Sequence, residues 1–223
     1  PKGYEIPADV DYFHCTSNNT IYGTQMKDFP STTSLIVCDM SSDIFSKKVN
    51  VADFDLIYAG AQKNMGPAGT TLVVVKDEIL GKTNRNIPTM LDYNTHIKKE
   101  SMFNTPPVFP VYVSMLTLDW LKKNGGVKWI EKVNQSKADL IYGEIDRNPL
   151  FTGIAAIEDR SNMNVTFLLN DTSLEERFNQ MWQTAGCNGL KGHRSVGGFR
   201  ASMYNALPLE SVQVLVDVMQ ELE

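Results

Sequence analysis

The sequence predicts an α/β protein that begins with a sheet domain and continues into a small α+β domain. Two patterns support this prediction. In the first 80 residues, short apolar runs alternate with turns of glycine, proline and polar residues. Runs that are apolar throughout, rather than at every second position, favour a sheet covered on both faces. From about Pro110 the apolar residues recur at helical spacing instead. We place the domain boundary between residues 1–115 and 116–223.

Three strands are predicted in the sheet domain, and each is bounded by turn residues. They comprise residues 34–38, 56–59 and 70–75. Asp39 follows the first strand, and the second runs into a glycine-flanked loop that contains Lys63. Open α/β sheets build their sites at the ends of strands, so we expect functional residues at these two positions.

Two helices are predicted around the domain boundary. The first begins behind Pro110, and the run Asn124-Gly125-Gly126 ends it. Its apolar residues at helical spacing are Val111, Met115 and Leu118. The second covers residues 127–146. Its apolar stripe comprises Trp129, Ile130, Val133, Ala138, Ile141 and Ile145.

A strand and two more helices are predicted in the remainder of the chain. The strand covers residues 165–169, and a capping box at residues 173–176 opens the next helix. That helix carries Leu174, Phe178, Met181, Trp182 and Ala185. The last helix begins at about Pro208. We expect it to bury Leu209, Val212, Leu215, Val216 and Met219.

Composition and charge restrict the class of protein. Hydrophobic residues make up 42% and charged residues 21%, which excludes a disordered chain. A net charge of −5 and an isoelectric point near 5.3 argue against nucleic acid as a partner. No apolar run approaches the roughly 20 residues of a membrane span, and residues 1–11 do not resemble a secretion signal. The three cysteines are therefore expected to be reduced thiols in a cytoplasmic protein. Neither they nor His14 and His96 show metal-ligand spacing, so no metal site is predicted.

Lys63 and Asp39 form the first candidate site. A lysine amine held in a cleft has a lowered pKa and can form an imine with a carbonyl compound. An aspartate at a neighbouring strand end can pair with a protonated heterocyclic nitrogen. The alternative is a solvated loop lysine and an aspartate in a turn, and on sequence geometry alone it is the better explanation, because such pairs are common.

A second candidate is the glycine-rich segment 192–202. His193, Arg194 and Arg200 lie among glycines that allow the backbone to approach a ligand closely. Arginine forks bind carboxylate and phosphate groups through two hydrogen bonds, so the segment is typical of an anion-binding site. The alternative is a flexible basic loop before a strand.

The third candidate is the segment 101–107, Ser-Met-Phe-Asn-Thr-Pro-Pro. Asn104 and Thr105 are small hydrogen-bonding residues that two prolines hold in an extended conformation. Taken alone, this segment is better explained by a rigid linker between domains.

Taken together, and in this order, three blocks of sequence resemble the phosphoserine aminotransferases. They are Ala59-Gly-Ala-Gln-Lys-Asn64 with the following Met65-Gly-Pro-Ala-Gly69, Ser101-Met-Phe-Asn-Thr-Pro-Pro107, and Lys191-Gly-His-Arg-Ser-Val-Gly-Gly-Phe-Arg-Ala-Ser-Met-Tyr-Asn205. These are pyridoxal-phosphate enzymes in the class V group of fold-type I aminotransferases. The resemblance covers essentially the whole chain. It implies that residues 1–115 are the C-terminal portion of a large, cofactor-binding mixed-sheet domain, and that residues 116–223 are the small C-terminal domain.

The resemblance also implies roles at the cofactor. Lys63 matches the lysine that forms an imine with pyridoxal phosphate, and Asp39 matches the aspartate that pairs with the ring nitrogen. Thr20 matches the ligand of the cofactor's phenolic oxygen, and Gln62 matches a phosphate ligand. Asn104 and Thr105 match phosphate ligands that the family supplies from the other subunit of a homodimer.

For the substrates, the resemblance implies a transfer of the amino group between glutamate and 3-phosphohydroxypyruvate, which gives 2-oxoglutarate and O-phosphoserine. Arg200 matches the ligand of the substrate α-carboxylate, and His193 and Arg194 match the pair near the substrate phosphate. The related step of pyridoxine biosynthesis is left open.

Two alternatives to this function remain open. Family members have a further N-terminal part, with a cofactor-phosphate site, a ring-stacking aromatic residue and a substrate His-Arg pair. The 223 residues do not include this part, so the first alternative is an inactive, truncated fragment. A cysteine desulfurase-like enzyme shares the fold, but those enzymes carry a histidine where this chain has Gln62. They also need a nucleophilic cysteine, for which only Cys187 is available, and a turn at the end of a helix explains that residue better.

Overall fold

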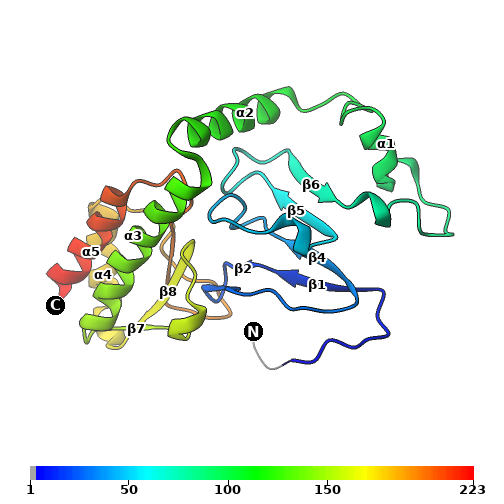
Figure 1. The fold of residues 1–223 in the computed structure, drawn as a ribbon. Helices are drawn as coiled ribbons and strands as arrows, with labels where there is room; N and C mark the ends of the chain where they lie inside the picture. The colour runs from blue at the N-terminus through cyan, green and yellow to red at the C-terminus, as the bar shows by residue number, and fades with distance from the viewer. Residues whose placement is uncertain (1–3) are drawn as a thin grey trace.

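The first part of the chain forms a four-stranded mixed sheet (Figure 1). The computed structural model describes residues 4–223. In spatial order the strands are β1 (Tyr12–Thr16), β4 (Leu35–Asp39), β5 (Leu56–Gly60) and β6 (Thr71–Val75). The first three strands are parallel and β6 is antiparallel to β5. A separate antiparallel pair is formed by β2 (Asn18–Asn19) and β3 (Thr24–Gln25). The three predicted strands are therefore confirmed, and β1 is an additional one.

The sheet is well buried on one face only within the described residues. Ile36, Cys38 and Ile57 face the core and are less than 7% exposed. Their neighbours on the opposite face, such as Leu35, are exposed or only half-buried. The expectation of a sheet covered on both faces is therefore not met by residues 4–223. The strand pattern indicates that a second covering layer is needed, because apolar side chains are present on both faces.

The second part of the chain packs helices against a three-stranded antiparallel sheet. The sheet contains β7 (Phe151–Gly153), β8 (Asn164–Leu169) and β9 (Phe199–Ser202), in that order. The helices of the chain are α1 (Tyr93–Ile97), α2 (Val108–Lys123), α3 (Gly126–Arg147), α4 (Glu175–Thr184) and α5 (Leu209–Leu222). Of these, α3, α4 and α5 supply the buried residues that pack on the small sheet. Short 3₁₀ turns are η1 (Val51–Asp53), η2 (Asp77–Ile79), η3 (Thr89–Leu91), η4 (Ile157–Asp159) and η5 (Thr172–Leu174). The long helices α2 and α3 follow one another along the side of both sheets (Figure 1).

Each of the two parts has its own apolar cluster. The first lies under the mixed sheet and includes Cys38, Phe54 and Ile57. The second lies between the small sheet and the helices, where Phe167 and Phe178 are both fully buried. Both clusters consist of side chains that leave water on folding, which is the main favourable contribution to stability.

Two predicted details of the helices are wrong. The capping box at residues 173–176 does not form, because Asp171, and not Ser173, accepts the hydrogen bond from a backbone amide of the first turn. Leu209 is 38% exposed, although the rest of its predicted stripe is buried as expected. The apolar residues of α2 are also exposed for the most part, and Met115 is an example at 53%. Spacing identified α2, α3, α4 and α5, but α1 was not predicted, and spacing did not indicate which face of α2 would be covered.

Membrane and metal features can be judged for residues 4–223. No helix in this range is both long enough and apolar enough to cross a membrane. The same range holds no group of three histidine, cysteine or acidic side chains that could bind a metal ion. Cys15, Cys38 and Cys187 are all free thiols.

Candidate active site

Asp39 ends β4 and is held there by its neighbours. Its Oδ1 accepts a hydrogen bond of 2.8 Å from the backbone amide of Ser41. Tyr58 lies directly opposite in the β4–β5 register, and the nearby carboxylate adds to burial in raising the pKa of the Tyr58 hydroxyl. The Tyr58 hydroxyl also lies 3.1 Å from Nε2 of His14 on β1. Asp39 is therefore fixed on the less buried face of the sheet, where a ligand can reach it.

Lys63 lies in the turn that follows β5. The turn closes on Ala61, whose carbonyl accepts hydrogen bonds from the amides of Met65 and Gly66. Lys63 is half-buried, and burial lowers the pKa of its amine. Among the nearby charges Arg200 lowers it further, and Asp39 opposes this effect. The turn thus presents an amine that loses its proton more readily than a solvated lysine.

Arg200 on β9 completes this group from the small sheet. Its Nη1 donates a hydrogen bond of 3.2 Å to the backbone carbonyl of Thr20. Its Nε is buried and has no hydrogen-bond partner within residues 4–223. A buried guanidinium nitrogen without an acceptor is costly, so it marks a place where an anionic ligand would be favoured.

The structure therefore brings four of the predicted residues together. Asp39, Lys63 and Arg200 interact through their charges, and Thr20 contacts Arg200. Gln62 is next to Lys63 and is exposed. Its side-chain amide lies close to Gly60, because a Cβ added at Gly60 would be only 2.4 Å from Oε1 of Gln62.

His193 and Arg194 lie at the tip of the loop that leads into β9. The loop is closed by the amide of Gly192, which donates to the carbonyl of Gly198. Within it, Nδ1 of His193 lies 2.7 Å from the hydroxyl of Ser195. Arg194 is exposed. The hydrogen bonds of the His193 side chain stay within its own loop. Within residues 4–223, no hydrogen bond therefore links His193 or Arg194 to the group around Lys63.

Asn104 and Thr105 are exposed in the segment between α1 and α2. The amide of Asn104 reaches the carbonyl of Thr105 at 3.5 Å, its contact within the described part of the chain. These residues are therefore free to contact something outside the described chain.

Several polar residues near the site were missed by sequence reasoning. Asp43 is buried, and its carboxylate accepts hydrogen bonds from Ser17 and Gln25. Burial raises the pKa of this carboxyl. Asn64, directly after Lys63, is only 4% exposed and bonds to the backbone. The polar residues between 39 and 43 were a signal for a side-chain network, but pairing across 18 to 26 residues is not visible in the sequence.

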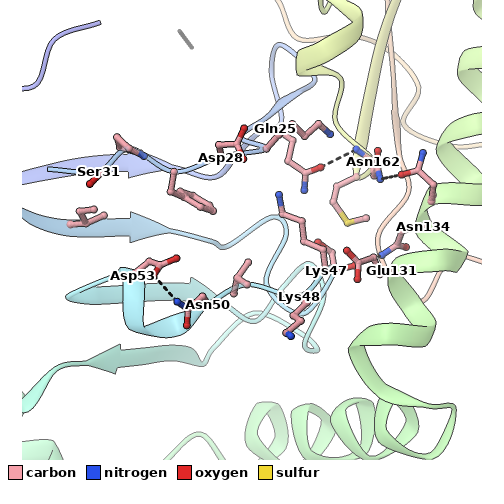
Figure 2. A pocket seen from close by; sticks show the side chains of 18 of the residues that line it. Gln25, Asp28, Ser31, Lys47, Lys48, Asn50, Asp53, Glu131, Asn134 and Asn162 are labelled. Carbon is pink, nitrogen blue, oxygen red and sulfur yellow. Dashed lines mark hydrogen bonds between the residues drawn. The ribbon is translucent and has the colours of Figure 1, made fainter. Parts of the chain in front are cut away.

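A cleft of about 830 Å³ lies elsewhere, between α3 and the segments on either side of β4 (Figure 2). It is lined by neither Lys63 nor Asp39. Two of its three lysines are already bound, because Lys27 donates to the carbonyl of Arg160 and Lys47 to that of Met26, both at 2.7 Å. Acidic side chains line it as well as lysines, so its volume alone does not make it a ligand site.

Comparison with known proteins gives a consistent result. The family described as aminotransferase class-V matches residues 4–215. The chain is 70% identical over 223 residues to a phosphoserine aminotransferase of Flavobacterium johnsoniae, and the match covers all of this chain and 63% of that protein. The chain thus spans about 63% of the length of that curated relative.

Solved structures agree with this sequence match. A phosphoserine aminotransferase of Bacillus circulans superimposes with a TM-score of 0.90 at 44% identity, over 95% of this chain and 59% of that one. A phosphoserine aminotransferase of Trichomonas vaginalis with bound PLP superimposes with a TM-score of 0.91 at 34% identity, over 97% of this chain and 62% of that one. The predicted fold class, part of a fold-type I transferase, is confirmed, and the chain belongs to the class-V aminotransferase family.

Proposed function

We propose that this chain is part of an enzyme that transfers the amino group of glutamate to 3-phosphohydroxypyruvate, with O-phosphoserine and 2-oxoglutarate as products. The observation that carries the proposal is the grouping of Lys63, Asp39 and Arg200, which come from three elements far apart in the sequence. The phosphoserine aminotransferase of Flavobacterium johnsoniae, at 70% identity, supports the substrate assignment.

Pyridoxal phosphate is the cofactor that fits these groups. When bound, it supplies an electrophilic carbonyl carbon and an electron-withdrawing ring. In this chain, Asp39 would hold the ring nitrogen and Lys63 the carbonyl carbon. Thr20 would bind the phenolic oxygen and Gln62 the phosphate. The donor set fits because it offers one amine with a lowered pKa beside one carboxylate.

The chain's own residues then divide the remaining work. Lys63, whose amine loses its proton readily, accepts the proton from the Cα of the amino donor and supplies the proton that the Cα of the product amino acid gains. Arg200 holds the α-carboxylate that both substrates share, for which its buried and unpaired Nε is suited. His193 and Arg194 hold the phosphate of the larger substrate from the loop before β9.

The proposal extends to assembly, location and domain division. Asn104 and Thr105 bind the cofactor phosphate of the partner subunit in a homodimer, which their exposure allows. The enzyme works in the cytoplasm, where its three free thiols stay reduced. The division at residues 115 and 116 is supported by the two separate apolar clusters on either side of it.

A desulfurase function is not favoured by Cys187. Burial raises the pKa of this thiol, whereas a nucleophilic cysteine needs a lowered one. Its backbone amide donates to the carbonyl of Trp182, beside Gly186 with φ of 83°. This is the geometry of a helix end.

A spectral titration of the complete enzyme that contains this chain tests the proposal. With pyridoxal phosphate bound, glutamate should bleach the absorption of the lysine-bound cofactor, and 3-phosphohydroxypyruvate should restore it. The Lys63→Ala variant is the control and should show neither change. Release of sulfide from cysteine would instead indicate a desulfurase, and no spectral response to any of these substrates would indicate an inert chain.

A further inference from the structure

Three consecutive backbone carbonyls after β4 are each bound by a different asparagine side chain. The carbonyl of Ile44 accepts from Asn64 at 3.0 Å, and that of Phe45 accepts from Asn205 at 3.1 Å. The carbonyl of Ser46 accepts from Asn134 at 3.2 Å. We call Asn64, Asn134 and Asn205 the asparagine bridge.

The three asparagines also bind one another. The amide of Asn134 donates to Oδ1 of Asn205 at 2.9 Å, and the backbone amide of Asn205 donates to Oδ1 of Asn64 at 3.0 Å. All three are buried, at 4% exposure or less. Water therefore cannot replace these bonds if one of them is lost, and the full desolvation penalty would remain.

Each asparagine belongs to a different part of the molecule. Asn64 directly follows Lys63 in the turn after β5, and Asn205 follows Arg200 in the loop after β9. Asn134 projects from α3 toward the segment that carries Lys47 (Figure 2). The carbonyls that they bind lie in the segment that follows β4, whose last residue is Asp39. The bridge thus joins the segments that carry Lys63, Arg200 and Asp39.

Two features show that the asparagine bridge stabilises a local structure that is unfavourable without it. Phe45 has φ of 57°, a left-handed conformation that is uncommon for a residue with a side chain. Asn134 keeps its Oδ1 buried without a partner among residues 4–223. A flipped amide would place that oxygen against two acceptors, the Ser46 carbonyl and Oδ1 of Asn205. The orientation is therefore determined by the bridge.

Accordingly, we propose that the asparagine bridge positions Lys63 relative to Arg200, and that Asn64, Asn134 and Asn205 are positioning residues of the site. The proposal rests on the proposed function only for its catalytic consequence. The placement of Lys63 itself can be measured with no substrate or cofactor present.

The test is the pH dependence of Lys63 acetylation in the complete enzyme that contains this chain, measured without cofactor. Trace acetylation with acetic anhydride, followed by mass spectrometry of peptides, gives the pKa of the Lys63 amine. The groups that set it are burial and the charges of Asp39 on β4, Asp43 in the following turn, and Arg200 on β9. A loosened bridge exposes the amine and separates it from Arg200, while Asp39 stays in its sheet ladder.

We therefore expect Asn205→Ala to raise the Lys63 pKa toward its ordinary value of 10.5. Asn205→Ala removes the side-chain bonds to the Phe45 carbonyl and to Asn134. Asn134→Ala removes those to the Ser46 carbonyl and to Asn205, so it should give a change in the same direction. Asn134→Ala can therefore test the proposal if Asn205→Ala does not fold. In the loaded enzyme, both variants should lose kcat/KM, by up to about 100-fold for a misplacement near 1 Å.

Asn148→Ala is the matched control. Asn148 is also buried, at 1% exposure, and binds a backbone carbonyl, that of Met219. It lies at the end of α3 and contacts none of the three bridge residues. Its loss should lower stability to a similar degree but leave the Lys63 pKa unchanged. An unchanged Lys63 pKa in folded Asn205→Ala and Asn134→Ala, or an equal change in Asn148→Ala, would overturn the proposal. If the proposed substrates are wrong, the labelling result still stands.

Discussion

The guanidinium of Arg200 donates a hydrogen bond of 3.2 Å to the backbone carbonyl of Thr20, which lies 180 residues earlier in the chain. This bond joins β9 of the small sheet to the turn after β2. It fixes one arm of the guanidinium and leaves its buried Nε unpaired within residues 4–223. The arginine is thus held in place before any anion binds, which reduces the entropy lost on binding.

Lys63 is expected to carry the cofactor. Borohydride reduction in the presence of pyridoxal phosphate should leave the pyridoxyl group on the peptide that contains Lys63, because a half-buried amine with a lowered pKa is the better nucleophile. Lys76 is the control, since it is bound to Asp55 at 3.0 Å. Lys63→Ala should abolish the label and Lys76→Ala should not. Label on the Lys76 peptide of the unaltered chain would contradict the assignment.

Asp39 and Arg200 are expected to shift the Lys63 pKa in opposite directions. A nearby negative charge favours the ammonium form, so Asp39→Asn should lower the Lys63 pKa still further. A nearby positive charge disfavours that form, so Arg200→Gln should raise the pKa toward 10.5. Peptide-resolved acetylation as a function of pH measures both changes. If both variants moved the pKa in the same direction, the charges would not act on Lys63 as the structure indicates.

Arg200 and Arg194 are expected to differ in the substrates that they serve. Loss of a two-pronged arginine contact to an anion costs about 1.5–3 kcal/mol. Arg200→Ala should therefore raise KM about tenfold or more for glutamate and phosphoserine alike. Arg194→Ala should raise it mainly for phosphoserine. Steady-state kinetics with the two substrates separates these outcomes, and an equal loss for both substrates in both variants would refute the division of roles.

Lys137 on α3 is expected to be important for stability. It is fully buried, and its Nζ donates to the carbonyls of Met203, Tyr204 and Leu207 at 3.0, 2.9 and 3.1 Å. Lys137→Met would leave these carbonyls without their donor, at about 1–3 kcal/mol for each buried group left unsatisfied. Urea unfolding should therefore show a loss of at least about 3 kcal/mol. The exposed Lys128 on the same helix is the control, and Lys128→Met should change stability by less than about 0.5 kcal/mol.

The burial of Lys137 also shows where sequence reasoning is insufficient. Helical spacing identified α3 and most of its apolar stripe, because burial of Ile130 and Ile141 follows the period of the helix. The same period places Lys137 on the buried side. A lysine is normally assigned to the surface, and its three carbonyl partners lie 66 to 70 residues away. Partners at that distance are determined by the fold and not by local pattern.

The candidate site was predictable to a similar extent. The positions of Asp39 and Lys63 at strand ends followed from the strand pattern, and the structure places them near Arg200. The asparagine bridge could not be predicted, because asparagine is common in turns and Asn64 and Asn205 both occupy turns. Their burial depends on the approach of α3 and the loop after β9, which no local pattern reports.

The last prediction concerns the homodimer. Asn104 and Thr105 are exposed in the segment before α2, where they are available to a partner subunit. If they bind the partner's cofactor phosphate, each site takes Lys63 from one subunit and Asn104 with Thr105 from the other. An inactive variant and a weakened one can then complement each other. One carries Lys63→Ala, and the other carries Asn104→Ala with Thr105→Ala.

The two variants are unfolded and refolded together in equal amounts. Random pairing makes about half of the dimers mixed, and two-fold symmetry gives each mixed dimer one site with both defects and one site with neither. About a quarter of all sites should then have wild-type composition, and the mixture should be more active than the average of its parents. If Asn104 and Thr105 act within their own chain, every site keeps one defect and the activity stays at that average. Mass spectrometry of the refolded dimers confirms that mixing occurred, so activity at the average in the presence of mixed dimers would overturn the assignment across the interface.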